Sequence, residues 1–336
     1  MNPNDPSSPL ADSAPSPPAA MPHPAPVPSA FEEARREPTH ANATGIAYMV
    51  VAVTLFSAMD AMAKWLIASY PLLQIIFVRS VVALIPLSIY LYWLVGTASA
   101  LRTRHPMKHV VRSVVGLVAL GCFFYALQGM PLANVVAIGF AAPLFITALS
   151  VPLLDEPVGV RRWCAVLVGC AGVLIIVLPR GEGFNQFALV ALCGTFFFAL
   201  LVILLRKMSR TESSAAIVFY FMVISIVLTG FAMPWYWVQP QGGDWLIFIA
   251  LGIVGGLAQI CMTNAFRHGE AVVVAPFDYL SILWATLIGY WVWGELPNSW
   301  VWLGVVIVMA SGLYILHREA ALKLPRGIAR RWQSRR

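Results

Sequence analysis

The sequence predicts an all-α integral membrane protein with ten transmembrane helices, arranged as two inverted five-helix repeats. Three observations carry this prediction. Of the 336 residues, 60% are hydrophobic and only 11% are charged, whereas a soluble globular protein has about 25% charged residues. The apolar residues form long runs separated by short polar breaks. Features of the first half of the chain recur in the second half, as in the span-ending residues Glu156 and Glu295.

Residues 1–43 have a different composition from the rest of the chain. They are rich in Pro, Ala and Ser, and such a segment buries too little apolar surface to offset the entropy of ordering. We therefore predict a disordered N-terminal segment. It has neither the basic start nor the apolar core of a secretory signal.

The ten predicted spans follow from residue 45 onward. Each run is about long enough to cross a ~30 Å hydrocarbon core as a helix, and helices satisfy the backbone in lipid. The runs lie at roughly 45–68, 72–95, 109–128, 131–153, 162–178, 186–206, 215–238, 245–266, 271–293 and 300–317.

The distribution of Lys and Arg predicts the orientation. With ten spans, all but three of the 22 Lys and Arg residues fall on the side of the two termini. The exceptions are Lys64, Arg79 and Arg180. Because cytoplasmic loops are enriched in Lys and Arg, we expect both termini, including the basic tail 318–336, in the cytoplasm.

The internal repeat divides the membrane part into residues 44–178 and 186–317. Glu156 and Glu295 lie 139 positions apart, and each ends the fourth span of its half. Five spans are an odd number, so the two halves have opposite topology. Secondary transporters use this plan and place their site near the bilayer midplane between the halves.

The pattern resembles the drug/metabolite transporter superfamily, with two EamA-type domains. Lys64 ends the first span, Pro71 and Arg79 lie in the second, Pro143 lies in the fourth, and Glu156 and Glu295 end spans. The resemblance implies a ten-helix carrier of small organic solutes such as vitamins, amino acids or nucleoside-like molecules. Members usually carry a proline midway through the ninth span, where this chain has Ile282, so we expect the corresponding bend elsewhere, at Pro276.

Ionisable residues inside the spans are the first candidates for a substrate site, because each costs several kcal/mol to bury in lipid. At about 1.5 Å per residue, Asp60, Arg79 and Asp278 lie close to the midplane, and Lys64 lies nearer the outer surface. Asp60 and Lys64 are also spaced for an i, i+4 ion pair. A structural ion pair between Asp60 and Lys64 is therefore an alternative to a role of these residues in substrate binding.

Charge balance favours a role for Asp278. Asp60, Lys64 and Arg79 sum to +1, so Arg79 is predicted to anchor the substrate and Asp278 to face it, with proton coupling as one role. Neutral residues complete the set. The predicted substrate-binding residues are Asp60, Lys64, Arg79, Asn134, Gln259, Asn264, Asp278, Tyr279 and Trp284.

Several functions are disfavoured. The five cysteines lie singly in apolar runs, so no disulfide or metal site is expected. Gly181-Glu182-Gly183 lacks the Lys-Ser/Thr of a phosphate loop, and no other cofactor is expected. The net charge of +7 follows topology rather than a nucleic-acid surface.

We predict a secondary transporter, not an enzyme, in a bacterial inner membrane. Its partners would be a small-molecule substrate, the lipid bilayer, and protons or an exchanged solute, and a homodimer through Gly252 and Gly256 stays open. The alternative is a membrane-embedded lipid-modifying enzyme. Such an enzyme would need a cluster of catalytic side chains, and the candidate cluster is His105, Lys108 and His109. The sequence shows no acidic partner for these residues.

Overall fold

A computed structural model of the chain describes residues 30–92, 101, 103, 105–154, 159–177, 185–208, 211–269 and 271–323. Within these ranges the structure is helical, with no strand. Residues 1–39 and 40–336 form separate units, and the account below concerns the second. The elements are α1 (Ala30–Ile67), α2 (Leu72–Tyr90), α3 (Pro106–Ala126), α4 (Leu132–Gly139), α5 (Ala142–Leu154), α6 (Val160–Val177), α7 (Gln186–Met208), α8 (Ser214–Gly230), α9 (Met233–Tyr236), α10 (Asp244–His268), α11 (Ala271–Val274), the 3-10 helix η3 (Ala275–Tyr279), α12 (Leu280–Trp293) and α13 (Ser299–Lys323).

The start of α1 differs from the predicted boundary at residue 44. The helix begins at Ala30, inside the segment expected to be disordered. Residues 30–36 read Ala-Phe-Glu-Glu-Ala-Arg-Arg, and most of these residue types favour helix. The rest of that segment, residues 1–29, lies outside the described residues, as does the basic tail from residue 324.

Seven described segments are long and apolar enough to cross a membrane, counting α4 and α5 as one. The apolar parts of α8 and α13 are shorter. The remaining predicted span, 271–293, is divided into α11, η3 and α12. The structure is thus an all-α membrane architecture, and the count of ten crossings stays a prediction.

Three predicted spans are interrupted in the described residues. The run 215–238 is divided into α8 and α9 at Phe231 and Ala232, and the other two interruptions lie at corresponding places in the two halves. The run 131–153 forms α4 and α5, which are separated at Phe140 and Ala141. The run 271–293 changes to a 3-10 helix at Ala275, directly before Pro276. The helix is therefore irregular at Pro276, where the bend was expected. Phe140 and Tyr279 are 139 positions apart, the spacing that relates Glu156 to Glu295.

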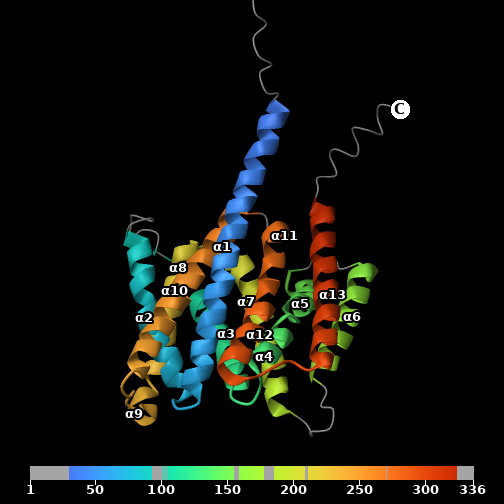
Figure 1. Cartoon of the computed structure of the whole chain (residues 1–336). Coiled ribbons are helices and arrows are strands. Elements are labelled where there is room, and N and C mark those ends of the chain that lie inside the picture. Colours follow the sequence, from blue (N-terminus) through green and yellow to red (C-terminus); the bar gives the residue numbers. More distant parts are fainter. Residues whose placement is uncertain are drawn as a thin grey trace, which may run out of the picture. The chain divides into compact units, whose positions relative to one another are not determined.

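The first helices of the two halves, α1 and α7, run in opposite directions through the bundle. Lys64 at the end of α1 donates a hydrogen bond to Met130 O, in the turn after α3. Gly129 in the same turn approaches Phe187, in the first turn of α7. The end of α1 and the start of α7 therefore share one end of the bundle, which we call the distal end. Figure 1 shows the opposite, terminal end, from which α1 enters and α13 leaves.

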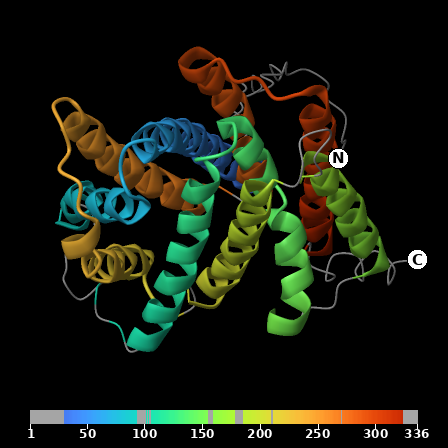
Figure 2. The ribbon, with the colours of Figure 1, turned by 90° about the horizontal axis from the view of Figure 1, so that it is seen from below.

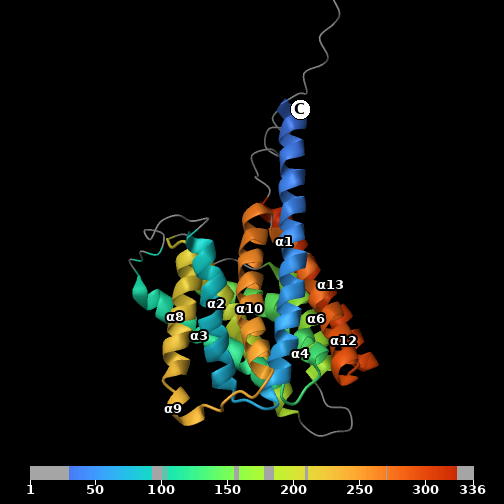
Figure 3. The same ribbon diagram turned by 60° about the vertical axis from the view of Figure 1, so that its left-hand side comes forward.

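Helices of the two halves pack against each other through small residues. The side-by-side pairs include α3 with α7, α6 with α13, and α2 with α10, which Figures 2 and 3 show from two directions. A Cβ atom on Gly252 would lie 2.4 Å from Val82 Cβ, and one on Gly256 would lie 2.7 Å from Pro86 Cγ. The GxxxG motif of α10 is thus used inside the chain, against α2, and is not free to form a homodimer.

Candidate functional site

The interruptions of α4–α5 and of α11–α12 meet each other. The rings of Phe140 and Tyr279 are in edge-to-face contact, with centroids 4.9 Å apart. The Tyr279 hydroxyl also lies 2.4 Å from where a Cβ on Gly312 of α13 would stand, so only glycine admits the tyrosine there. Non-helical backbone inside a membrane protein occurs where it is packed by protein or lines a cavity. The meeting point of the two halves is therefore the candidate substrate site.

Gly139, directly before Phe140, adjoins open space. A Cβ atom built on Gly139 would meet no atom within 4 Å. Its repeat partner, 139 positions on, is Asp278, whose side chain is exposed. The Asp278 carboxylate has no hydrogen bond or ion pair in the part of the chain that the structure describes; Ser281 Oγ donates to its backbone oxygen, at 2.7 Å. At equivalent positions of the repeat, the first half therefore has Gly139 and open space, whereas the second half has the carboxylate of Asp278.

Asp60 and Arg79 form the second charged feature of the interior. Arg79 is 4% exposed, and its charge interacts with that of half-buried Asp60. Arg79 Nε lies 3.4 Å from Met59 Sδ, while Nη1 is buried without a hydrogen-bond partner. The guanidinium packs beside Gly255 of α10, where a Cβ would stand 3.3 Å from Nε. Arg79 thus lies between α1, α2 and α10, and no described contact joins it to Asp278.

Lys64 does not pair with Asp60, as the i, i+4 spacing suggested. Its ammonium instead forms an ion pair with Glu295, at 2.7 Å from Oε1, and donates to Met130 O at 3.1 Å. Gly294, with φ of +68°, ends α12 and turns the chain so that Glu295 faces α1. Glu295 Oε2 also accepts the backbone N–H of Leu132, the first residue of α4, at 3.3 Å. We call the Lys64–Glu295 contact the distal ion pair.

The distal ion pair changes the charge balance expected from the sequence. Lys64 is neutralised by Glu295, a residue that ended a span in the sequence analysis but was not a predicted site residue. Asp60 and Arg79 then balance each other, so the predicted positive excess facing Asp278 is absent. The i, i+4 pattern was misleading because Lys64 and Glu295 are 231 positions apart, a separation at which no local spacing rule applies.

The neutral candidates have varied environments. Asn134 on α4 has a buried Oδ1 atom without a hydrogen-bond partner. Asn264 donates to Ile260 O of its own helix, at 3.1 Å. Gln259 lines a hollow between α2, α8 and α10 with Leu87, Tyr90 and Thr263. Trp284 packs against a small cluster formed by Met49, Val53, Ala265 and Val274. Only Tyr279 lies directly at the meeting point, and Phe140 was missed by the sequence reasoning although the 139-residue shift relates it to Tyr279.

A further distal contact joins the two halves. The Tyr70 hydroxyl donates to Asp244 Oδ2 at 2.6 Å, and the backbone N–H of Gln241 donates to the Tyr70 oxygen at 3.1 Å. The hydrogen bond to Asp244 raises the pKa of Tyr70 above its ordinary value. Gln74 exchanges two hydrogen bonds with the backbone of Val238. The turn between α1 and α2 is thus attached to the segment before α10.

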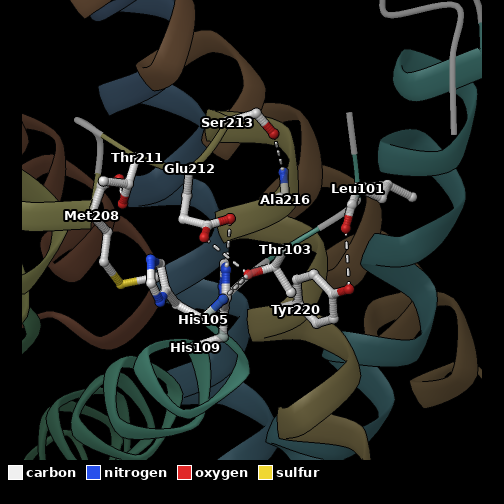
Figure 4. A network of polar contacts seen from close by, with 10 residues as sticks. All are labelled: Leu101, Thr103, His105, His109, Met208, Thr211, Glu212, Ser213, Ala216 and Tyr220. Carbon is white, nitrogen blue, oxygen red and sulfur yellow. Dashed lines mark hydrogen bonds and ion pairs between the residues drawn. The ribbon is translucent and has the colours of Figure 1, made fainter. Parts of the chain in front are cut away.

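A polar network at the terminal end supplies an acid that the sequence reasoning missed (Figure 4). Glu212 accepts a hydrogen bond from Thr103 Oγ1 at 3.0 Å, and its Oε2 lies 3.4 Å from Nε2 of His109. Burial opposes ionisation of Glu212, but the contacts with Thr103 and His109 and the nearby His105 lower its pKa overall. The side chains of His109 and Glu212 are only 1% and 3% exposed. No group of three or more potential metal ligands occurs in the described residues.

Comparison with known proteins supports a membrane architecture built from two repeats. The model of the EamA-like transporter family matches residues 43–178 and 186–316. The chain belongs to the EamA-like transporter family.

Relatives from several bacteria align along most of the chain. An S-adenosylmethionine uptake transporter of Rickettsia felis is 27% identical, covering 82% of this chain and 93% of the relative. A riboflavin transporter of Rhizobium johnstonii is 26% identical, covering 84% and 94%. A pseudopaline exporter of Pseudomonas aeruginosa is 30% identical, covering 80% and 94%. A crystal structure with 20% identity has a TM-score of 0.58 over 85% of this chain and 99% of that one, and shares the fold.

The distal ion pair should show strong energetic coupling. Lys64→Met or Glu295→Gln alone leaves a charge unpaired, which we expect to destabilise the protein by roughly 1–3 kcal/mol. The double variant Lys64→Met/Glu295→Gln removes both charges and should cost less than the sum of the two single effects. Melting temperatures of purified variants in detergent measure this coupling. Additive effects of the two substitutions would show that the contact contributes no stability.

Glu212 should make stability depend on acid pH. Because its pKa is lowered in the folded protein, its contribution is present above its ordinary pKa of 4.5 and is lost as the pH falls through the folded value. The melting-temperature difference between wild type and Glu212→Gln should therefore shrink below about pH 4.5. Thr103→Val, which removes one donor, should reduce the same difference. A difference that does not vary with pH would contradict this assignment.

Proposed function

We propose that the protein is a secondary carrier of a small organic metabolite that works by alternating access. The observation that supports this most is the contact of Phe140 with Tyr279, where the interruptions of α4–α5 and α11–α12 meet. Interrupted helices at a repeat interface are where secondary transporters bind their solutes. The relatives are named for uptake or export of different small metabolites, which supports the class of function.

We infer from the distribution of Lys and Arg how the protein is oriented in the bacterial inner membrane. The terminal end carries most of the Lys and Arg residues and would face the cytoplasm. The distal end would then face outward, held closed by the Lys64–Glu295 and Tyr70–Asp244 contacts. Opening to the outside would require these contacts to separate, and the cost would be offset by new contacts or by the bound solute.

The proposed substrate site centres on Tyr279 and Asp278 from the second half and Asn134 from the first. Asn134 is included because its Oδ1 atom is buried without a partner, which a solute donor would satisfy. Asp60 and Arg79 act as a neutral pair beside it, with the unpaired Nη1 atom as a further donor. Lys64 acts through the distal ion pair. Gln259, Asn264 and Trp284 are peripheral, and a proton or an exchanged solute would supply the driving force.

For the alternative of a lipid-modifying enzyme, the structure supplies an acidic partner for the histidines but no site that a lipid could reach. Glu212 lies against His109, which completes an acid–histidine pair at the terminal end. Both side chains are almost fully enclosed, so a lipid headgroup could not reach them without a rearrangement. We therefore assign this network to structure, joining α3 to the start of α8.

Transport by the purified chain in proteoliposomes tests the proposed function. We expect saturable counterflow of at least one solute from a metabolite panel that includes S-adenosylmethionine and riboflavin. Gly139→Phe should fill the open space beside Phe140 and lower uptake by roughly tenfold or more. The matched control is Gly121→Phe, because Gly121 also has no neighbour within 4 Å of a built Cβ but lies on the exposed stripe of α3 with Val114 and Val118.

Two results would contradict the proposal. Uptake by Gly139→Phe equal to that of Gly121→Phe would place the transport path elsewhere. Formation of a chemically altered product without movement of solute would favour the enzyme alternative.

A further inference from the structure

Asp278 carries a negative charge that the described residues of the protein do not compensate. Within the spans, Asp60 is matched by Arg79, and Lys64 is matched by Glu295. No described side chain forms a hydrogen bond or ion pair with the Asp278 carboxylate. Asp278 lies within the predicted span 271–293, and a carboxylate inside a span without a counter-charge is costly, so this position calls for a positive partner.

Arg112, a buried cation of α3, is not that partner. It lies near the terminal start of α3, and its guanidinium packs over the Phe221 ring of α8, at 4.2 Å from the centroid. It is 4% exposed, and no described contact or electrostatic interaction relates it to Asp278. The aromatic face supplies part of its stabilisation.

The surroundings of Asp278 suit a solute rather than a protein cation. The side chain is exposed, and its neighbour Tyr279 touches Phe140 across the repeat interface. Beside Phe140 stands Gly139, with no atom within 4 Å of a built Cβ. One carboxylate, two aromatic rings and adjoining open space are thus gathered where the interruptions meet. Aromatic faces and a carboxylate together favour alkylated cations, whose charge is spread and whose hydration is weak.

We propose that Asp278 is the counter-charge for a positively charged group on the transported solute, and that the carrier selects organic cations such as sulfonium or quaternary ammonium compounds. This inference rests on the proposed transport function and specifies the solute class. A neutral solute of the same shape gains nothing from the carboxylate, and an anionic solute is repelled by it. The sequence predicted a positive excess of charge opposite Asp278, and the pairing of Lys64 with Glu295 removes that excess.

Matched pairs of solutes that differ mainly in charge test this inference. The pairs are S-adenosylmethionine with S-adenosylhomocysteine, arginine with citrulline, and N1-methylnicotinamide with nicotinamide. Uptake of each is measured in proteoliposomes with the full chain as wild type, Asp278→Asn, Asp278→Glu and the control Ser281→Ala, which removes a neighbouring hydroxyl. Thermal-shift binding in detergent provides a second readout, and the melting temperature without solute shows whether each variant folds.

We expect at least one cation to be taken up roughly tenfold or more faster than its neutral twin. The preference should fall toward unity in Asp278→Asn and persist in Asp278→Glu and Ser281→Ala. If Asp278→Asn does not fold, Asp278→Ser, which also removes the carboxylate, takes its place and should show the same loss of preference.

Three results would overturn the inference. Equal uptake of neutral twins would refute cation selection while leaving the carrier function intact. An unchanged preference in folded Asp278→Asn, or in folded Asp278→Ser when the Asn variant does not fold, would remove Asp278 as the counter-charge. Failure of all three cations to be bound or transported would reject the cation class, and counterflow of any other solute would then show that the carrier function still holds.

Discussion

A helix inside a bilayer can be interrupted only where its freed backbone groups are enclosed by protein or reached by water. This constraint fixes where the interruptions of α4–α5 and α11–α12 can lie. Both are directed into the bundle, and they touch through Phe140 and Tyr279. Because the two sites are related by the 139-residue repeat, one contact brings together the least regular parts of both halves.

The charges of the interior are arranged around that contact. The distal ion pair fastens the end of α1 to the start of α4 and to the connection between α12 and α13. Its effect reaches beyond stability, because it removes Lys64 from the charge balance of the midplane. Asp278 has no counter-charge among the described residues, and the repeat has Gly139 at the equivalent place. An asymmetric solute bound between similar halves requires such a difference between them.

The sequence was sufficient to predict the helical membrane class, the two EamA-type repeats and an irregular helix at Pro276. These features follow from the apolar runs, the repeated residues and the chemistry of proline. Pro143 is a helix-breaking residue in the fourth span, but the continuous apolar run 131–153 did not indicate that the helix would be interrupted at Phe140. The Lys64 partner was mispredicted because Asp60 is near in sequence, whereas Glu295 becomes a neighbour only after the halves pack. Glu212 was missed for the same reason, since its contacts come from α3 and the segment before it.

The central claim is that the interruptions adjoin one solvated site that is closed at the distal end by Lys64 and Glu295. Cysteine accessibility of Gly139→Cys in a cysteine-free background tests it most directly, using a membrane-impermeant maleimide on vesicles of both orientations. The account predicts labelling from the cytoplasmic side, with labelling from the outer side appearing when Glu295→Gln is added. A cysteine at position 139 that reacts from neither side, or equally from both without the second substitution, would contradict it.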